Sequence, residues 1–275
     1  MRAMADLLMV TSQAPVDGYV ARSLDLARRL GGRLAGAFLR PAFPLPVYRV
    51  EGGWISDSLL RQMIAAQRSA VDAAETRARD DFMARAAKAG VHAEWIAFDT
   101  AGELVARARL SDLVIAPSGR RLAGEDLDFD AGQLGLACGR PLVAIAGTRP
   151  VVSVGHRVMI CWNGTRESAR AWRDAWPVIA AADSVALAVV RPEIDFDDLA
   201  DLKFRLSRWD RPVDTFADDA HDSLAPEVLR RRAGEWGCDL LVMGLYGRSR
   251  LSEQILGGVS REFMTDPPCP LLVSH

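Results

Sequence analysis

The fold is decided by one stretch of the chain, residues 239–258, which reads DLLVMGLYGRSRLSEQILGG. An apolar run leads into the turn Gly244-Leu245-Tyr246-Gly247, and nine residues separate this turn from Gly257-Gly258. A short continuous apolar run is typical of a parallel strand that is buried on both faces. Glycines at the end of such a strand let the backbone approach a bound group at the carboxyl edge of the sheet. The stretch therefore predicts a strand, a glycine-rich loop and a helix of a parallel α/β sheet.

The rest of the second half continues this alternation of strands and helices. The predicted strands, which are short, apolar and rich in β-branched residues, are 157–162, 184–190, 212–216, 239–243 and 270–274. The predicted helices are 166–181, 224–236 and 252–264. Continuous apolar strands separated by helices predict a parallel sheet with helices on both faces.

The first half of the chain repeats the pattern. The apolar run 7–10 corresponds to 158–161 at an offset of 151 residues, and 112–115 corresponds to 239–242 at an offset of 127. The first half therefore carries about 24 extra residues in its middle. They fall at 57–89, a stretch rich in Ala and Arg that predicts one long helix.

The duplication predicts two domains, 1–149 and 150–275, with a Pro- and Gly-containing linker near 148–155. A length of 275 residues agrees with two domains. Residues 41–53 contain three prolines and two glycines and predict a loop ahead of the long helix.

Composition excludes several classes of protein. Apolar residues make up 49% of the chain and charged residues 25%, which is typical of a globular protein. The formal net charge of −2 argues against nucleic-acid binding by bulk electrostatic attraction. The longest uncharged stretch, residues 7–16, is half the length of a spanning helix, and the first apolar run is too short for a signal peptide. We therefore expect no membrane contact and a cytoplasmic location.

Common metal and nucleotide motifs are absent from the sequence. The four cysteines and four histidines are scattered and form no CxxC pair, so we expect no metal site and treat the cysteines as small buried apolar residues. Neither Lys88 nor Lys203 follows a glycine, so there is no P-loop.

The glycine-rich stretch can be interpreted in two ways. Its exposed backbone N–H groups, the following helix N-terminus and the side chains of Arg248 and Arg250 could bind phosphate oxygens. Alternatively, Gly244 only ends a strand, the loop is a plain turn and both arginines are solvated. The residues alone leave both interpretations open.

Residues 239–275 resemble the C-terminal motif of the universal stress protein family: an apolar strand, GxxG, nine residues, a glycine pair, a helix and a Pro-containing last strand. The resemblance to a family member with two tandem domains covers the whole chain, and its motifs are specific in the second half. It implies two doubly wound, Rossmann-like α/β domains, each a five-stranded parallel sheet of order 3-2-1-4-5. In the ATP-binding branch it implies an adenine nucleotide, ATP or AMP with or without Mg²⁺, lying across strands 1 and 4.

The resemblance also implies roles for individual residues of the second half. Around the phosphates it implies Gly244, Gly247, Gly257, Gly258 and Val259, beside Arg248 and Arg250 of the same loop. Around the nucleoside it implies Cys161, Trp162 and Asn163 by the adenosine, Met243 by the ribose and Val189 by the adenine.

Two residues depart from the family pattern. Gly258 stands where the family usually has Ser or Thr, so one hydroxyl contact to phosphate, worth about 0.5–1.5 kcal/mol, is missing. Asn163 stands where the family usually has Asp; an amide both donates and accepts, so contacts to the ribose can persist. Asn163-Gly164 is also a common turn pair, and this second interpretation stays open.

The first half lacks the motif and is expected to be a degenerate domain. At the repeat offset, the positions of the three motif glycines hold Pro117, Arg120 and Asp130, or Asp128 if the offset is 129. Proline has no N–H to offer, and the four carboxylates within 124–130 would repel a triphosphate. We therefore expect one nucleotide per chain, in the second half. The alternative is that the acidic loop holds a cation that bridges to phosphate.

Two functions follow as hypotheses: a nucleotide-binding stress-response or regulatory protein, or an interaction module that acts through protein partners without a nucleotide. Beyond a weak ATPase we expect no enzyme, because Glu253 is the one carboxylate near the glycines in sequence, and at a helix start it complements the helix dipole. The last strands, 142–146 and 270–274, would be bare edges, so we expect them to pair within the chain. A homodimer through the helix 57–89 is a further expectation.

Overall fold

The computed structural model describes residues 5–12, 18–41, 49–50, 53–54, 57–119, 130–146, 153–190, 196–207, 212–245 and 258–275. The strands of the first half are β1 (Asp6–Thr11), β2 (Arg33–Leu39), β3 (Arg49–Val50), β4 (Gly53–Trp54), β5 (Ala93–Phe98), β6 (Leu113–Ser118) and β7 (Leu142–Ala146). Its helices are α1 (Tyr19–Leu30), α2 (Asp57–Ala89), α3 (Ala101–Ala108) and α4 (Ala131–Cys138).

The second half repeats this alternation of strands and helices, with helices of different lengths between the strands. Its strands are β8 (Arg157–Trp162), β9 (Ser184–Val190), β10 (Val213–Asp218), β11 (Leu240–Gly244) and β12 (Leu271–Ser274). Its helices are α5 (Arg166–Asp174), α6 (Trp176–Ala181), α7 (Phe196–Ser207), α8 (Ala225–Trp236) and α9 (Gly258–Thr265), with a 3₁₀ turn at Asp222–Leu224.

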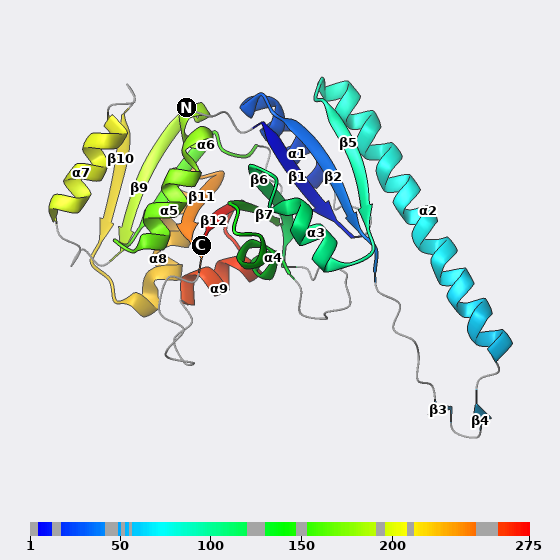
Figure 1. Cartoon of the computed structure of the whole chain (residues 1–275). Coiled ribbons are helices and arrows are strands. Elements are labelled where there is room, and N and C mark those ends of the chain that lie inside the picture. The colour runs from blue at the N-terminus through cyan, green and yellow to red at the C-terminus, as the bar shows by residue number, and fades with distance from the viewer. Residues whose placement is uncertain are drawn as a thin grey trace.

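The two halves form one continuous sheet of ten strands in the order β10-β9-β8-β11-β12-β7-β6-β1-β2-β5 (Figure 1). Numbered within each half, both segments have the order 3-2-1-4-5, as predicted. Within each half of this ten-stranded sheet, neighbouring strands are parallel. The last strands β12 and β7 pair antiparallel, with Leu271 opposite Ala144 and Val273 opposite Leu142. The prediction that the two edges cover each other within the chain is therefore confirmed.

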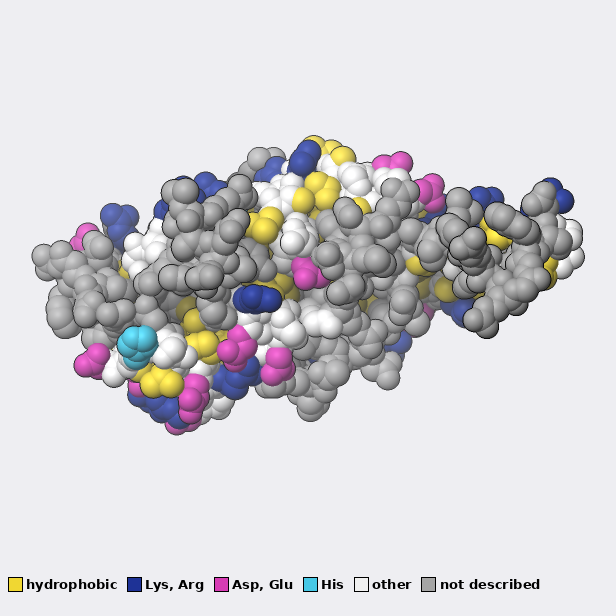
Figure 2. Space-filling view, turned by 90° about the horizontal axis from the view of Figure 1, so that it is seen from below, with side chains coloured by type: hydrophobic (Ala, Val, Ile, Leu, Met, Phe, Trp, Pro, Cys, Tyr) yellow, Lys and Arg dark blue, Asp and Glu magenta, His cyan; other side chains and the backbone are white. Residues whose placement is uncertain are grey.

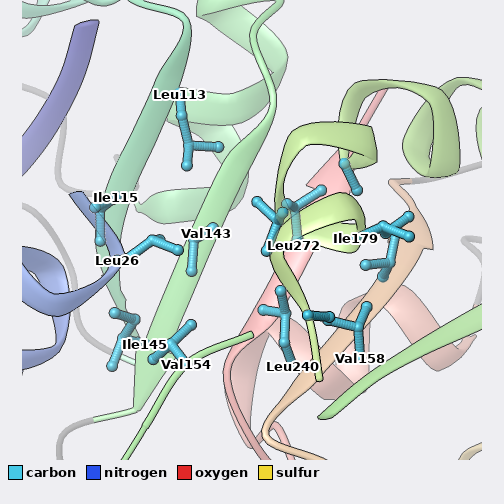
Figure 3. Close-up of a cluster of buried hydrophobic side chains, with 14 of the residues drawn as sticks. Leu26, Leu113, Ile115, Val143, Ile145, Val154, Val158, Ile179, Leu240 and Leu272 are labelled. Atoms are coloured by element: carbon cyan, nitrogen blue, oxygen red, sulfur yellow. The ribbon is translucent and has the colours of Figure 1, made fainter. Parts of the chain in front are cut away.

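Side chains alternate along the strands and build one apolar cluster on each face of the sheet. One cluster joins strand residues to α1, α2, α5 and α6, and the other joins them to α3, α4, α8 and α9. Figure 3 shows the first cluster crossing the junction, where Val143 of the first half lies beside Leu272 of the second. The halves therefore share a core, since described residues of both halves belong to one cluster of buried side chains.

A half-buried cation reinforces the same junction. The guanidinium of Arg29 in α1 donates to the carbonyl oxygens of Val154 at 2.6 Å, Gly155 at 3.0 Å and Ala181 at 2.8 Å. These three carbonyls belong to the second half, so one first-half side chain satisfies backbone acceptors that would otherwise lie unpaired near the core.

The long helix α2 has the predicted bounds and lies outside the edge strand β5 (Figure 1). Its second part buries Ala78, Phe82 and Ala86, whereas most side chains of its first part are exposed. None of the helices in the described part of the chain combines the length and apolar character needed to cross a membrane.

Three sequence-based expectations about local structure need correction. The single helix predicted for 166–181 ends at Asp174 and restarts at Trp176, because Pro177 lacks an N–H and is tolerated only in a first turn. The predicted loop 41–53 contains the short strands β3 and β4, which pair with each other. Helix α7 was not predicted.

Two further expectations fall on residues that the structure does not describe. The predicted helix 252–264 is described from Gly258 onward. Residues 148–152 of the predicted linker 148–155 lie outside the described residues, so the division at 149/150 stays a prediction.

Candidate functional site

The predicted site residues of the strands converge at the carboxyl edge of the second-half sheet. Here β8 lies between β9, the next strand along the chain, and β11, so this edge is the point where the strand order reverses. Trp162 pairs with Val189, and Ile160 pairs with Val242. Cys161 and Met243 each follow one residue after that last pair, so the structure brings both strands' predicted residues together.

Gly244 permits a close approach between β11 and the first turn of α5. A Cβ atom at this position would lie 2.6 Å from the Cβ of Glu167 and 2.9 Å from the backbone N of Ser168. Any side chain would therefore push α5 away from the sheet. This packing contact is a structural reason for the glycine, and its predicted part in phosphate binding stays a prediction.

The carbonyl oxygen of Gly244 also anchors the helix beyond the loop. The hydroxyl of Ser260, in the first turn of α9, donates to it at 2.9 Å. This bond holds the start of α9 against the end of β11, with Gly258 and Val259 opening the helix. The first N–H groups of a helix have no partner within it and favour a negative group. The predicted residues Gly247, Arg248, Arg250 and Gly257 lie outside the described residues.

Asn163 takes part in a local turn. Its Oδ1 accepts from the backbone N–H of Thr165 at 3.3 Å and from the hydroxyl of Thr165 at 2.8 Å. Gly164 has a φ of +72°, a left-handed conformation that suits glycine. The Thr165 hydroxyl in turn caps α5 by accepting from the N–H of Ser168. The structure therefore bears out the turn interpretation of Asn163-Gly164, and the exposed side chain keeps its amide group beside the edge.

The remaining nucleoside candidates differ in exposure. Val189, Met243 and Cys161 are only 1%, 6% and 9% exposed, so their side chains belong to the core. Trp162 is half-buried, and its Nε1 is a buried donor without a hydrogen-bond partner in the structure. An unpaired buried donor costs free energy unless a ligand or water satisfies it.

Sequence reasoning missed Glu167, a buried carboxylate beside Gly244. It accepts a hydrogen bond from Nε of Arg166 at 2.5 Å. Burial is the largest influence on its pKa and raises it, but hydrogen bonds from Arg166 and the backbone, with the charges of Arg166 and His275, outweigh burial and lower the pKa. Glu167 is therefore ionised at neutral pH. The sequence signal that could have indicated Glu167 was its position in the first turn of the predicted helix 166–181, just after a predicted strand.

The first half places different side chains at the corresponding edge. The buried hydroxyl of Tyr19 lies 2.8 Å from the carbonyl oxygen of Val10 in β1 and 3.0 Å from that of Ile115 in β6. Asp130 caps α4, because its carboxylate accepts from the N–H of Gln133 at 2.9 Å. A tyrosine thus bridges strands 1 and 4, and a carboxylate occupies the helix N-terminus. Of the acidic loop 124–130, only Asp130 is among the described residues.

Charges of both signs are interspersed on the surface. Figure 2, seen from the end at which β9 and β10 terminate in Figure 1, shows Lys or Arg beside Asp or Glu among the described residues. The described residues contain no group of three or more His, Cys, Asp or Glu side chains placed to hold a metal ion.

These features define a class of protein: two doubly wound α/β halves joined edge to edge through their last strands, with a glycine-rich loop at the switch point of the second half. Residues 198–275 match the model of the Universal stress protein family. Residues 198–275 therefore carry the sequence pattern of this family, and the first half has the same strand order as the second. The resemblance predicted from the glycine motif is confirmed.

Solved structures support the fold over the full length. A universal stress protein from Archaeoglobus fulgidus DSM 4304 aligns with a TM-score of 0.70 at 16% identity, covering 98% of this chain and 96% of that chain. A protein of unknown function from Pseudomonas aeruginosa PAO1 aligns with a TM-score of 0.57 at 12% identity, covering 99% and 92%. No curated protein matches the sequence. At these identities the likeness concerns the fold alone.

Proposed function

We propose that this chain is a regulatory protein of the stress response that binds one adenine nucleotide, ATP or AMP, in its second half. The observation that carries the proposal is the bond from Ser260 to Gly244, which holds the end of β11 and the start of α9 together on either side of the glycine-rich loop. At a topological switch point, this arrangement offers backbone N–H groups and a helix N-terminus to an anion.

The proposed contacts place the phosphates and the nucleoside at different parts of the carboxyl edge. The phosphates would bind the loop glycines and the N-terminus of α9, with Arg248 and Arg250 as further donors. The nucleoside would lie over Trp162 and Asn163, with the backbone of Val189, Met243 and Cys161 beside it. Mg²⁺ would accompany the triphosphate form, because Glu167 places an ionised carboxylate near this edge.

An interaction module without a nucleotide is the second candidate, and two observations favour it. Gly244 is needed for the close packing of α5 against β11, and Oδ1 of Asn163 accepts a hydrogen bond within a turn. Either residue can therefore be explained without a ligand. In that case the edge would serve only to shape a surface for protein partners, and a homodimer through α2 would be one such partner.

Isothermal titration of the full chain with Mg²⁺-ATP and with AMP separates the two candidates. The proposed function gives a stoichiometry of about one nucleotide per chain and a higher melting temperature at saturation. A stoichiometry near two would contradict the degenerate first half. An absence of both heat and thermal stabilisation at millimolar nucleotide would favour the interaction module.

The substitution Trp162→Phe tests the nucleoside end of the site. It removes the unpaired Nε1 donor and keeps most of the ring, so affinity should fall about fivefold, as one hydrogen bond of about 1 kcal/mol predicts. Trp172→Phe is the matched control, because Trp172 packs edge-on against Trp176 with ring centroids 5.9 Å apart. Equal affinities for both variants in the same titration would remove Trp162 from the site.

A further inference from the structure

Two thiols meet at the opposite, amino edge of the second-half sheet. Cys238 lies between Gly237, which ends α8, and the start of β11, and Cys269 lies just ahead of β12. Their Sγ atoms are 3.7 Å apart, and both are free thiols. The sequence separates them by 31 residues and gives no motif that pairs them.

The backbone around the two residues is held by hydrogen bonds. The N–H of Cys238 donates to Ala233 at 2.8 Å, and the N–H of Leu241 donates to Pro270 at 2.9 Å. Leu241 pairs with Leu271, so the two cysteines precede neighbouring parallel strands at nearly the same level. Neighbouring strands lie about 4.8 Å apart, within the Cα separation of about 4.4–6.8 Å that a disulfide spans. A small side-chain movement would therefore bring the sulfurs to bonding distance.

The two thiols are not equivalent. Cys238 is half-buried, whereas Cys269 is only 4% exposed. The hydrogen bond between the two sulfurs, together with burial, raises the pKa of the Cys269 thiol. The Sγ of Cys269 also lies 3.6 Å from the carbonyl oxygen of Pro270, and the Sγ of Cys238 lies 3.2 Å from that of Leu240. Cys238 is thus the sulfur that an oxidant reaches first, and Cys269 lies in contact as the resolving thiol.

We propose that Cys238 and Cys269 form a reversible intrachain disulfide when the protein meets a peroxide. The Cys238 thiolate attacks one peroxide oxygen, the O–O bond breaks, and a sulfenic acid and one water form after protonation. The Cys269 sulfur then attacks the sulfenic sulfur, the S–O bond breaks, and the leaving hydroxide takes the thiol proton as a second water. In sum, two thiols lose two electrons and two protons, and hydrogen peroxide is reduced to two waters.

The position of this link connects it to the rest of the domain. The segment 238–269 contains β11, the glycine-rich loop and α9, so the disulfide ties together both ends of the segment that carries the motif. It also joins the strand that pairs with the first half to the end of α8. The proposal rests on the sulfur contact alone and is independent of nucleotide binding.

Peroxide treatment of the full chain under native conditions tests it. The freshly reduced protein is oxidised with hydrogen peroxide, denatured, alkylated and digested for mass spectrometry. The expected result is one cross-linked peptide pair containing Cys238 and Cys269, alkylation at Cys138 and Cys161, and complete reversal by dithiothreitol. The melting temperature of the oxidised chain should rise by about 5 °C, as closure of a loop of this length predicts.

Any of three results would overturn the proposal: alkylation of all four cysteines, a link from Cys238 to Cys161, or oxidation of Cys238 to a sulfinic acid without a cross-link. Cys161 is the informative comparison, because burial raises the pKa of its thiol and so keeps this thiol unreactive. In Cys269→Ala, Cys238 should stop at a sulfenic acid that dimedone traps. Cys138→Ala, in α4 of the first half, is the matched control and should form the link as the unmodified chain does. The result with the unmodified chain decides the question even if Cys269→Ala does not fold.

Discussion

The carboxyl edges of the two halves have the same strand order but different side chains. In the first half, Tyr19 bridges the carbonyls of β1 and β6, and Asp130 caps α4 with its own carboxylate. In the second half, Gly244 brings α5 onto β11, and Ser260 fixes the start of α9. The comparison teaches that a duplicated fold can present different side chains at its strand ends, which is where ligand binding in such folds is decided.

The largest expected effect concerns the glycine that the first half lacks. Gly257→Val should lower nucleotide affinity at least a hundredfold, because a branched side chain blocks the approach of phosphate to the backbone, while the melting temperature of the free protein stays the same. Titration calorimetry and a thermal melt measure both quantities. Normal binding by this variant would place the phosphates elsewhere, and loss of folding would instead indicate a backbone role for the glycine.

The substitution Gly244→Ala tests the contact between α5 and β11. The added Cβ would meet backbone atoms of Glu167 and Ser168 at 2.8 and 2.9 Å, so the free energy of unfolding should fall by about 2–3 kcal/mol. Urea denaturation measures it. Gly234→Ala in α8 is the matched control, because its Cβ would meet nothing within 4 Å, and it should stabilise the protein by up to about 1 kcal/mol. Equal stabilities of the two variants would contradict the packing role of Gly244.

Tyr19→Phe tests the bridge between β1 and β6 in the first half. Loss of the hydroxyl leaves two buried carbonyls with one donor fewer and should lower the free energy of unfolding by about 1–2 kcal/mol. Nucleotide stoichiometry should stay at one per chain, because Pro117 and Asp130 remain. A second binding event in this variant would show that the Tyr19 hydroxyl alone prevents nucleotide binding in the first half.

The same variant carries a pH dependence. Burial raises the pKa of Tyr19 well above its ordinary value, against a smaller opposing effect of the hydrogen bond to Val10. The folded state therefore holds the phenol proton more tightly than the unfolded state. This contribution to stability is complete below pH of about 10 and is lost as pH rises from there toward the folded pKa. Urea denaturation from pH 9 upward should show a smaller alkaline loss for Tyr19→Phe than for the unmodified chain.

The smallest expected effect is at the first-half helix. Asp130→Ala removes the acceptor for the N–H of Gln133 and should lower the free energy of unfolding by about 1 kcal/mol. It should not create a nucleotide site, because the glycines are still absent. Asp130→Asn, which keeps a capping oxygen, should recover most of the stability. If both variants lose the same stability, the carboxylate charge rather than the cap is what α4 requires.

The order of strands and helices could be predicted because it depends on local patterns. Continuous apolar runs gave β8 and β9 their bounds, and the Ala- and Arg-rich stretch 57–89 gave α2 its bounds. The helix break before Pro177 was also a local effect, and the prediction missed it by giving Ala content more weight than the missing N–H. The sheet order came from the resemblance to the universal stress protein family, and the repeat extended it to both halves.

The sequence by itself determined the alternation of strands and helices, the duplication and the place of the glycine motif, because each depends on residues close together along the chain. The tertiary structure decided which side chains meet. It placed Tyr19 between β1 and β6, Glu167 against Gly244, Arg29 on second-half carbonyls, and Cys238 beside Cys269. Such contacts join residues dozens of positions apart, and they are set by strand order, register and the burial of a shared core, which local periodicity does not encode.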